Sequence, residues 1–173
     1  MLGKLFLSIC LLPFLLFANN INKCKLDPSI LVTIAKVEKN KKRKAGYPYL
    51  ISFNNKSDAI FIRKKLGKTI FLDQRTIDCK NKKLCKDITN FLVSQKITNL
   101  DLGPFQINYK YHKMRVEDYF SFKKSYFKAC NFISKLIKEN GYNWRTIAMY
   151  HSATPKYNYN YLKKISLLTK KGE

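Results

Sequence analysis

Four cysteines downstream of an apolar N-terminal segment limit what this chain can fold into more than any other feature. They are Cys24, Cys79, Cys85 and Cys130. An even number of cysteines predicts structural disulfide bonds wherever the compartment is oxidising, and three pairings are possible. Cys79 with Cys85 would close a short local loop. That pairing would leave Cys24 and Cys130 to connect the start of the domain with a late helix.

The N-terminal segment indicates the compartment. Lys4 precedes an apolar run, Leu5–Ala18, that is shorter than the roughly 20 residues a helix needs to span a bilayer. A positive residue followed by such a run is typical of a secretory signal peptide. We expect residues 1–18 to be this signal, residues 19–173 to form one domain, and the mature protein to be periplasmic without a stable membrane span. An uncleaved N-terminal anchor is the alternative.

The chain is strongly basic, with 34 basic and 11 acidic side chains and a formal net charge of +23. Such a charge favours polyanions, including nucleic acids and anionic envelope polymers. The basic residues are scattered along the whole chain, and no arginine-rich stripe, zinc finger or aromatic RNA-binding motif accompanies them. We therefore expect no nucleic-acid partner. His112 and His151 are far from any CxxC pair, so we predict neither a metal site nor a cofactor.

Helical patterns occupy both ends of the domain. Asp27-Pro28 suits a helix start, because Asp caps free amide groups and Pro is accepted at the first helical position. Residues 30–40 then place four side chains on one helical face, namely Leu31, Ile34, Ala35 and Glu38. The longest helical pattern covers 117–139 and ends at Asn140-Gly141. Asn143 can cap a further helix with Trp144 in the core, and a last amphipathic helix follows Pro155.

Between about residues 45 and 99 the pattern changes. Segments 49–53 and 69–72 are short and rich in aromatic and β-branched residues, so we predict strands there. Ser57 could cap a short helix that ends at Gly67, and residues 87–95 are predicted to form another helix. The expected fold is a single α+β domain, mostly helical, with a small irregular β lobe.

One glutamate stands apart from the others. The chain after residue 18 has four: Glu38, Glu117, Glu139 and Glu173. Only Glu38 falls on an apolar helical face, where burial would raise its pKa and keep it protonated near neutral pH, as a general acid requires. Lys36 and Lys39 are sequence neighbours that could instead lower this pKa and make Glu38 a solvated residue at the helix end.

Three segments resemble, in the right order, the signatures of the lytic transglycosylase family. They are IAKVEKN around Glu38, GPFQIN at 103–108 and IAMYHS at 147–152. The YHS-x-TP form at 150–155 is similar to the members that accompany envelope-spanning secretion systems. The resemblance covers nearly the whole chain after the signal. It implies a lysozyme-like domain, with residues 45–99 as an insertion, that acts on peptidoglycan glycan strands and has a secretion or flagellar envelope complex as a potential partner.

The resemblance also implies roles for residues. Glu38 would protonate the glycosidic oxygen between MurNAc and GlcNAc and then act as a base, so that the muramyl C6 hydroxyl closes a 1,6-anhydro product. Gln106 would hold the substrate or Glu38, and Tyr150 would support the carboxyl or the developing positive charge. Three neighbours of these residues are further candidates for substrate contact: Phe105, Asn108 and His151.

Other interpretations remain open. Lys39 stands where the family commonly has Ser, Pro104-Phe105 replaces Leu-Met, and the interval between Glu38 and Gln106 is long. A hydrolytic muramidase would need a second carboxylate, for which Asp101 is the best candidate. A non-catalytic basic protein that binds peptidoglycan is the alternative from another class. Gln106 and Tyr150 could also be ordinary turn and core-edge residues.

Overall fold

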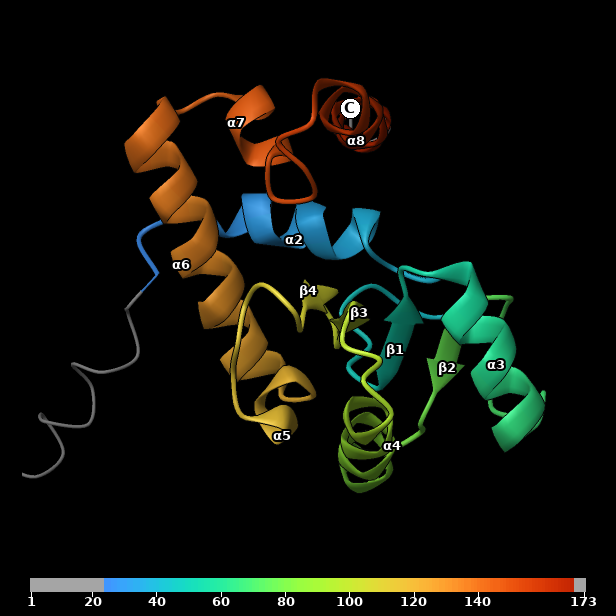
Figure 1. The fold of residues 1–173 in the computed structure, drawn as a ribbon. Coiled ribbons are helices and arrows are strands. Elements are labelled where there is room, and N and C mark those ends of the chain that lie inside the picture. Colours follow the sequence, from blue (N-terminus) through green and yellow to red (C-terminus); the bar gives the residue numbers. More distant parts are fainter. Residues whose placement is uncertain (1–23, 170–173) are drawn as a thin grey trace, which may run out of the picture.

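A computed structural model describes residues 24–169 and shows a mostly helical α+β domain with a four-stranded antiparallel sheet (Figure 1). The predicted fold class is therefore confirmed. The predicted signal peptide lies outside the described residues. The elements in chain order are α2 (Pro28–Val37), β1 (Leu50–Phe53), α3 (Lys56–Leu66), β2 (Thr76–Asp78), α4 (Lys82–Ser94), β3 (Leu100–Leu102), β4 (Ile107–Asn108), α5 (Val116–Tyr119), α6 (Phe122–Asn140), α7 (Trp144–Ala148) and α8 (Pro155–Thr169).

Helix α2 begins as the sequence predicts and ends earlier. The Asp27 carboxylate accepts a hydrogen bond from the Ser29 amide at 2.8 Å, and Pro28 is the first helical residue. The helix buries Leu31, Ile34 and Ala35 and ends at Val37, with Glu38 as its C-terminal cap. The extension predicted to residue 40 is wrong. The loop that follows turns toward the β lobe, where Asn40 donates a hydrogen bond to Asp73 and Arg43 pairs with the buried carboxylate of Asp78.

The sheet has the strand order β2-β1-β3-β4. Strand β1 was predicted, whereas the strand predicted at residues 69–72 is wrong, since Phe71 makes only an isolated bridge with Ile77. The Asp73 carboxylate accepts hydrogen bonds from the amides of Arg75 and Thr76, both at 2.8 Å. This turn reverses the chain, so that residues 76–78 are the ones that pair with β1.

Helices α3 and α4 lie beside and below the sheet (Figure 1). The cap of α3 is Asn55 and not the predicted Ser57, while Gly67 ends the helix in a left-handed conformation, with φ of 83°. Helix α4 begins at Lys82, earlier than predicted, because the Asn81 side chain accepts a hydrogen bond from the Leu84 amide. The predicted β lobe is thus a structured unit with helices of its own.

The long helix predicted at 117–139 is two helices, α5 and α6. Between them the Ser125 hydroxyl donates a hydrogen bond to the Tyr119 carbonyl at 2.6 Å. The backbone of Tyr119 lies so close to Gly103 that a Cβ on Gly103 would be 1.9 Å from the Tyr119 oxygen. Because the helix is interrupted, the backbone at the end of α5 packs directly against the turn that joins β3 to β4. Only glycine at position 103 permits this close approach.

Helices α7 and α8 lie on the side of α2 opposite the sheet, where α8 packs on α2 and α7 packs on α6 and α8 (Figure 1). Asn143 caps α7 as predicted, accepting a hydrogen bond from the Thr146 amide at 2.8 Å. The prediction that Trp144 lies in the core is wrong, because this side chain is 41 % exposed. Helix α8 begins at Pro155 and buries Tyr161 and Ile165.

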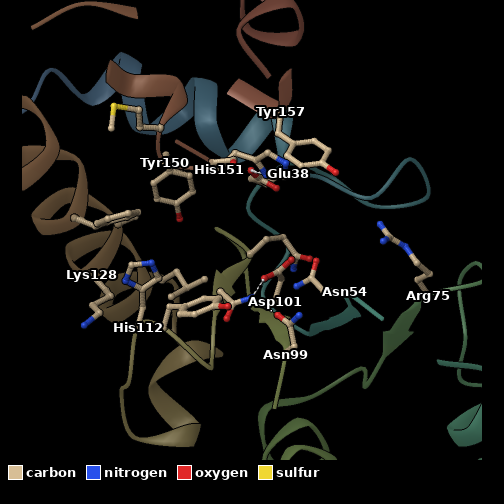
Figure 2. A pocket seen from close by; sticks show the side chains of 18 residues that line it. Glu38, Asn54, Arg75, Asn99, Asp101, His112, Lys128, Tyr150, His151 and Tyr157 are labelled. Carbon is tan, nitrogen blue, oxygen red and sulfur yellow. Dashed lines mark hydrogen bonds and ion pairs between the residues drawn. The ribbon is translucent and has the colours of Figure 1, made fainter. Parts of the chain in front are cut away.

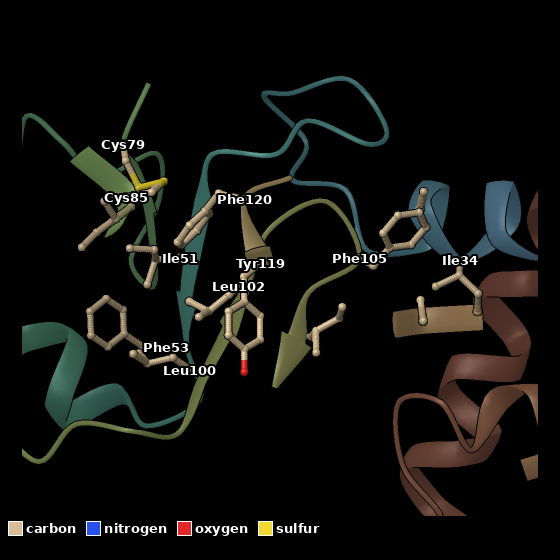
Figure 3. Close-up of a cluster of buried hydrophobic side chains, with 14 of the residues drawn as sticks. Ile34, Ile51, Phe53, Cys79, Cys85, Leu100, Leu102, Phe105, Tyr119 and Phe120 are labelled. Carbon is tan, nitrogen blue, oxygen red and sulfur yellow. A yellow bond between two sulfur atoms is a disulfide. The ribbon is translucent and has the colours of Figure 1, made fainter. Parts of the chain in front are cut away.

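Two disulfides join these parts, and their pairing confirms the disulfide prediction. Cys24 bonds to Cys130 on α6, and Cys79, which follows β2, bonds to Cys85 on α4. Both cysteines of the second disulfide belong to the buried core (Figure 3). The core is continuous from the sheet to α2, so the two walls of any cleft between them rest on one packed interior.

Candidate active site

A pocket of about 730 Å³ lies between the helices and the sheet. This volume is in the range of ligand-binding sites. Glu38, Tyr150 and His151 line it from the helical side, and Asp101 and Asn108 line it from the sheet (Figure 2). The other lining residues are Asn54, Arg75, Asn99, Gln106, Ile107, Tyr111, His112, Lys128, Ala129, Phe132, Met149, Ser152 and Tyr157.

Glu38 lies at the end of α2 with a carboxyl that is largely removed from water, since its side chain is only 15 % exposed. The pKa of this carboxyl is raised to about 7, chiefly by burial and in smaller part by the negative charge of Asp101. The nearby Tyr161 hydroxyl and the charge of Lys164 act in the opposite direction. At neutral pH a large fraction of Glu38 is therefore protonated, and Lys36 and Lys39 do not prevent this.

Tyr161 and His151 form the support behind Glu38. Their rings stack at a centroid distance of 4.8 Å. The Tyr161 hydroxyl is buried and forms no hydrogen bond of normal geometry within residues 24–169, yet it lies close enough to Glu38 to lower the pKa of that carboxyl. His151 Nδ1 is 4.0 Å from Glu38 Oε1. Burial and the charge of Lys164 lower the pKa of His151, which favours the neutral imidazole beside Glu38.

Asp101 on β3 is the second carboxyl of the pocket. Asn108 donates a hydrogen bond to Asp101 at 2.8 Å and another to Asn99 at 3.0 Å. Burial raises the pKa of Asp101, while hydrogen bonds from Asn54 and Asn108 and the charge of Arg75 act in the opposite direction. The predicted site residue Asn108 thus lies in the pocket, where it orients Asp101.

Gln106 and Tyr150 lie in the pocket as predicted, but each is already engaged with the turn that joins β3 to β4. Gln106 has a left-handed backbone, with φ of 47°, and its amide nitrogen donates a hydrogen bond to the Gly103 carbonyl at 2.8 Å. The Tyr150 hydroxyl donates to the Phe105 carbonyl at 2.8 Å. The first bond is internal to this turn, and the second connects the end of α7 to the sheet.

The predicted contact between Phe105 and a substrate is wrong. Its ring is 1 % exposed and packs against Phe122 and Tyr126 in the core, away from the pocket. Figure 3 shows Phe105 beside Ile34 of α2. Phe105 therefore supports the helix that carries Glu38, and neither Pro104 nor Phe105 lines the pocket.

Sequence reasoning missed much of the opposite wall. Asn54 follows β1, Asn99 precedes β3 and Arg75 precedes β2, so these side chains meet only because the strands pair. His112 and Lys128 are likewise brought together by the packing of α6 on the loop after β4. The sequence signal for these residues was their polar character at the ends of strands. This signal does not identify the pocket unless the order of the strands in the sheet is known.

Among residues 24–169, no group of three or more histidine, cysteine, aspartate or glutamate side chains is arranged to hold a metal ion. No helix in the same range is long and apolar enough to cross a membrane. Comparison of the chain with protein-family models, with curated proteins and with solved structures finds no match. A function is therefore inferred from the chemistry of the pocket.

Proposed function

We propose that this protein is a periplasmic peptidoglycan lytic transglycosylase of lysozyme-like type, with Glu38 as its acid and base. One observation carries the proposal: a carboxyl with a pKa of about 7 opens into a large polar pocket. A carboxylic acid that keeps its proton near neutral pH is what cleavage of a glycosidic bond requires. The ordered resemblance of three segments, of which Glu38, Gln106 and Tyr150 all line the pocket, points to the same activity.

In the proposed reaction Glu38 donates its proton to the glycosidic oxygen as the bond to the anomeric carbon breaks. Positive charge then develops on the sugar, between Glu38 and Asp101, and the nearby carboxylates stabilise it. Glu38, now ionised, accepts the proton of the C6 hydroxyl as its oxygen bonds to the anomeric carbon. The products are a 1,6-anhydro end and a free hydroxyl, and Glu38 is protonated again.

The test is mass spectrometry of purified peptidoglycan digested by the mature chain and by Glu38→Gln. The amide resembles the carboxyl in shape but cannot donate an acidic proton. We expect anhydromuropeptides from the wild type alone. Peptidoglycan binding without products from the wild type, in any pH or salt condition, would instead support the non-catalytic binding protein.

Asp101 favours a second candidate, a hydrolytic muramidase. This residue lines the pocket opposite Glu38, and the amides of Asn54 and Asn108 favour its ionised form, as a base that activates water would need. Digestion in ¹⁸O-labelled water separates the two reactions. Hydrolysis places the label at a reducing end, whereas formation of the anhydro product incorporates none.

The proposed setting follows from the sequence. Residues 1–18 would direct export, and the YHS-x-TP form at 150–155 is similar to transglycosylases that serve secretion machines. We therefore propose that the enzyme opens the wall for a secretion or flagellar envelope complex. Comparing assembly of such a complex in cells with the wild type and with Glu38→Gln tests this role.

A further inference from the structure

Two cations flank the carboxyl pair. Lys128 extends from α6 and Arg75 from the segment before β2, and both line the pocket that holds Glu38 and Asp101. Figure 2 shows Lys128 and His112 on one side of Asp101 and Arg75 on the other. The pocket thus has acidic groups at its centre and a positive charge toward each side.

Neither cation forms an ion pair with a carboxylate among residues 24–169. The Arg75 guanidinium makes no hydrogen bond or ion pair there, and Lys128 Nζ donates only to the carbonyl of Lys113, at 3.3 Å. Arg43, in contrast, is paired with the buried carboxylate of Asp78. The two pocket cations are therefore free to receive an anion from a ligand.

The charge of each cation reaches the interior of the pocket. Arg75 opposes the rise that burial produces in the pKa of Asp101. Lys128 adds to the effect of burial in lowering the pKa of His112. A ligand bound between Glu38 and Asp101 would therefore be attracted most strongly if it carried a negative charge toward each side of the pocket. At the centre, beside the two carboxyls, a neutral group that accepts a proton would be favoured.

We infer that Arg75 and Lys128 bind carboxylates that the glycan strand carries on both sides of the bond to be cleaved. The inference rests on the proposed function and names the feature by which the pocket recognises its substrate. In peptidoglycan such carboxylates have two sources, the lactyl group of muramic acid after removal of the peptide, and the peptide stem itself. A strand of N-acetylglucosamine alone has neither.

The test measures binding separately from turnover. The mature chain with Glu38→Gln is titrated calorimetrically with three hexasaccharides of equal length. One is neutral chitin hexasaccharide, one is a peptidoglycan fragment freed of peptide by an amidase, and one retains its stems. The same titrations are repeated with two double variants, in which Arg75→Gln or Lys128→Gln is combined with Glu38→Gln. Arg145→Gln and Lys124→Gln are matched controls, because both residues are exposed and outside the pocket.

We expect the carboxylated strands to bind about tenfold or more tightly than chitin, and each pocket substitution to weaken their binding about tenfold, as one charge-assisted hydrogen bond would. Chitin affinity and both controls should stay within about twofold. Preference for the peptide-free fragment would identify the lactyl carboxylate, and preference for the stem-bearing fragment the peptide. Equal affinity for all three strands, or equal losses in the controls, would overturn the inference.

The outcome for carboxylate binding can be distinguished from the outcome for the proposed enzymatic function. Anhydro products from the wild type without any preference among the strands would reject the role of the cations and leave the transglycosylase standing. Preference for carboxylated strands in a protein that never cleaves them would reject the enzyme and keep the binding site.

Discussion

The helical part of the molecule and the β lobe each contribute one wall of the pocket, one carboxyl and one disulfide, yet the two carboxyls have different surroundings. Glu38 follows the buried apolar face of α2, and the buried Tyr161 hydroxyl lowers its pKa together with the charge of Lys164. Asp101 on β3 is surrounded by amides, from Asn54 and Asn108. Burial raises the pKa of both groups, but only Asp101 has several donors that favour its charged form.

Two carboxyls that share a pocket can act as acid and as ionised partner when their environments treat the charged form differently. In the proposed reaction the buried carboxyl of Glu38 is the proton donor, and Asp101, whose hydrogen bonds favour its charged form, is the ionised group across from it. Four predictions test this contrast between the two walls.

The largest expected effect is a difference in the catalytic rate lost when each of the two carboxyls is replaced by an amide. Glu38→Gln should lower kcat/KM on the order of 10³- to 10⁴-fold, the full contribution of a general acid. Asp101→Asn should lower it only about tenfold, because in the proposed reaction Asp101 acts through its charge alone. Release of anhydromuropeptides measures both rates, and Glu139→Gln, at an exposed position on α6, is the control. A loss in Asp101→Asn as large as in Glu38→Gln would favour the muramidase.

The two disulfides should differ in their contribution to stability. Cys24 and Cys130 are 106 residues apart, whereas Cys79 and Cys85 are separated by 6. Loop-closure entropy predicts about 4.7 kcal/mol for a loop of about 100 residues and roughly 2 kcal/mol for the short loop. Denaturant unfolding of the two double alanine variants checks this. Equal losses would mean that the β lobe depends on its disulfide as much as the helices depend on theirs.

Glu38 should make the folded protein less stable as pH rises. Its pKa is about 7 when folded and 4.5 in an ordinary setting, so the unfolded chain releases the proton first. The wild type should therefore be most stable relative to Glu38→Gln below pH 4.5. It should lose on the order of 3 kcal/mol of that advantage between pH 4.5 and 7.

Urea unfolding of both proteins across this pH range measures the change. Glu139→Gln, at an exposed position on α6, is the control variant in the same measurements. A constant difference between the wild type and Glu38→Gln would mean that water reaches the Glu38 carboxyl freely.

The smallest effects should be shifts of the pH–rate profile, in opposite directions for the two walls. The alkaline limb of kcat/KM should lie near pH 7 in the wild type, since it reports the pKa of Glu38. Tyr161→Phe removes the hydroxyl that lowers this pKa, so the limb should move to higher pH. Asp101→Asn removes a negative charge that raises it, so the limb should move to lower pH. Shifts of the same sign would contradict the contrast.

Local signals along the chain determined several parts of this protein. Asp27-Pro28 began α2, Asn143 began α7, and the apolar spacing of Leu31, Ile34 and Ala35 placed Glu38 at the edge of a buried face. The even number of cysteines predicted disulfides, with the observed pairing as one of three possible. These features depend on neighbours within one or two helical turns or on the closure of a short loop, so the sequence contains their causes.

Only the tertiary structure decided the opposite wall. Strand β2 forms at 76–78 because the Asp73 turn reverses the chain against β1, and α5 separates from α6 because Gly103 packs on Tyr119. The same packing buried Phe105, directed the Tyr150 hydroxyl to the Phe105 carbonyl and brought Arg75 to the pocket. Each of these outcomes joins segments distant in the chain, and contacts between such segments follow from the assembled core and not from local propensity.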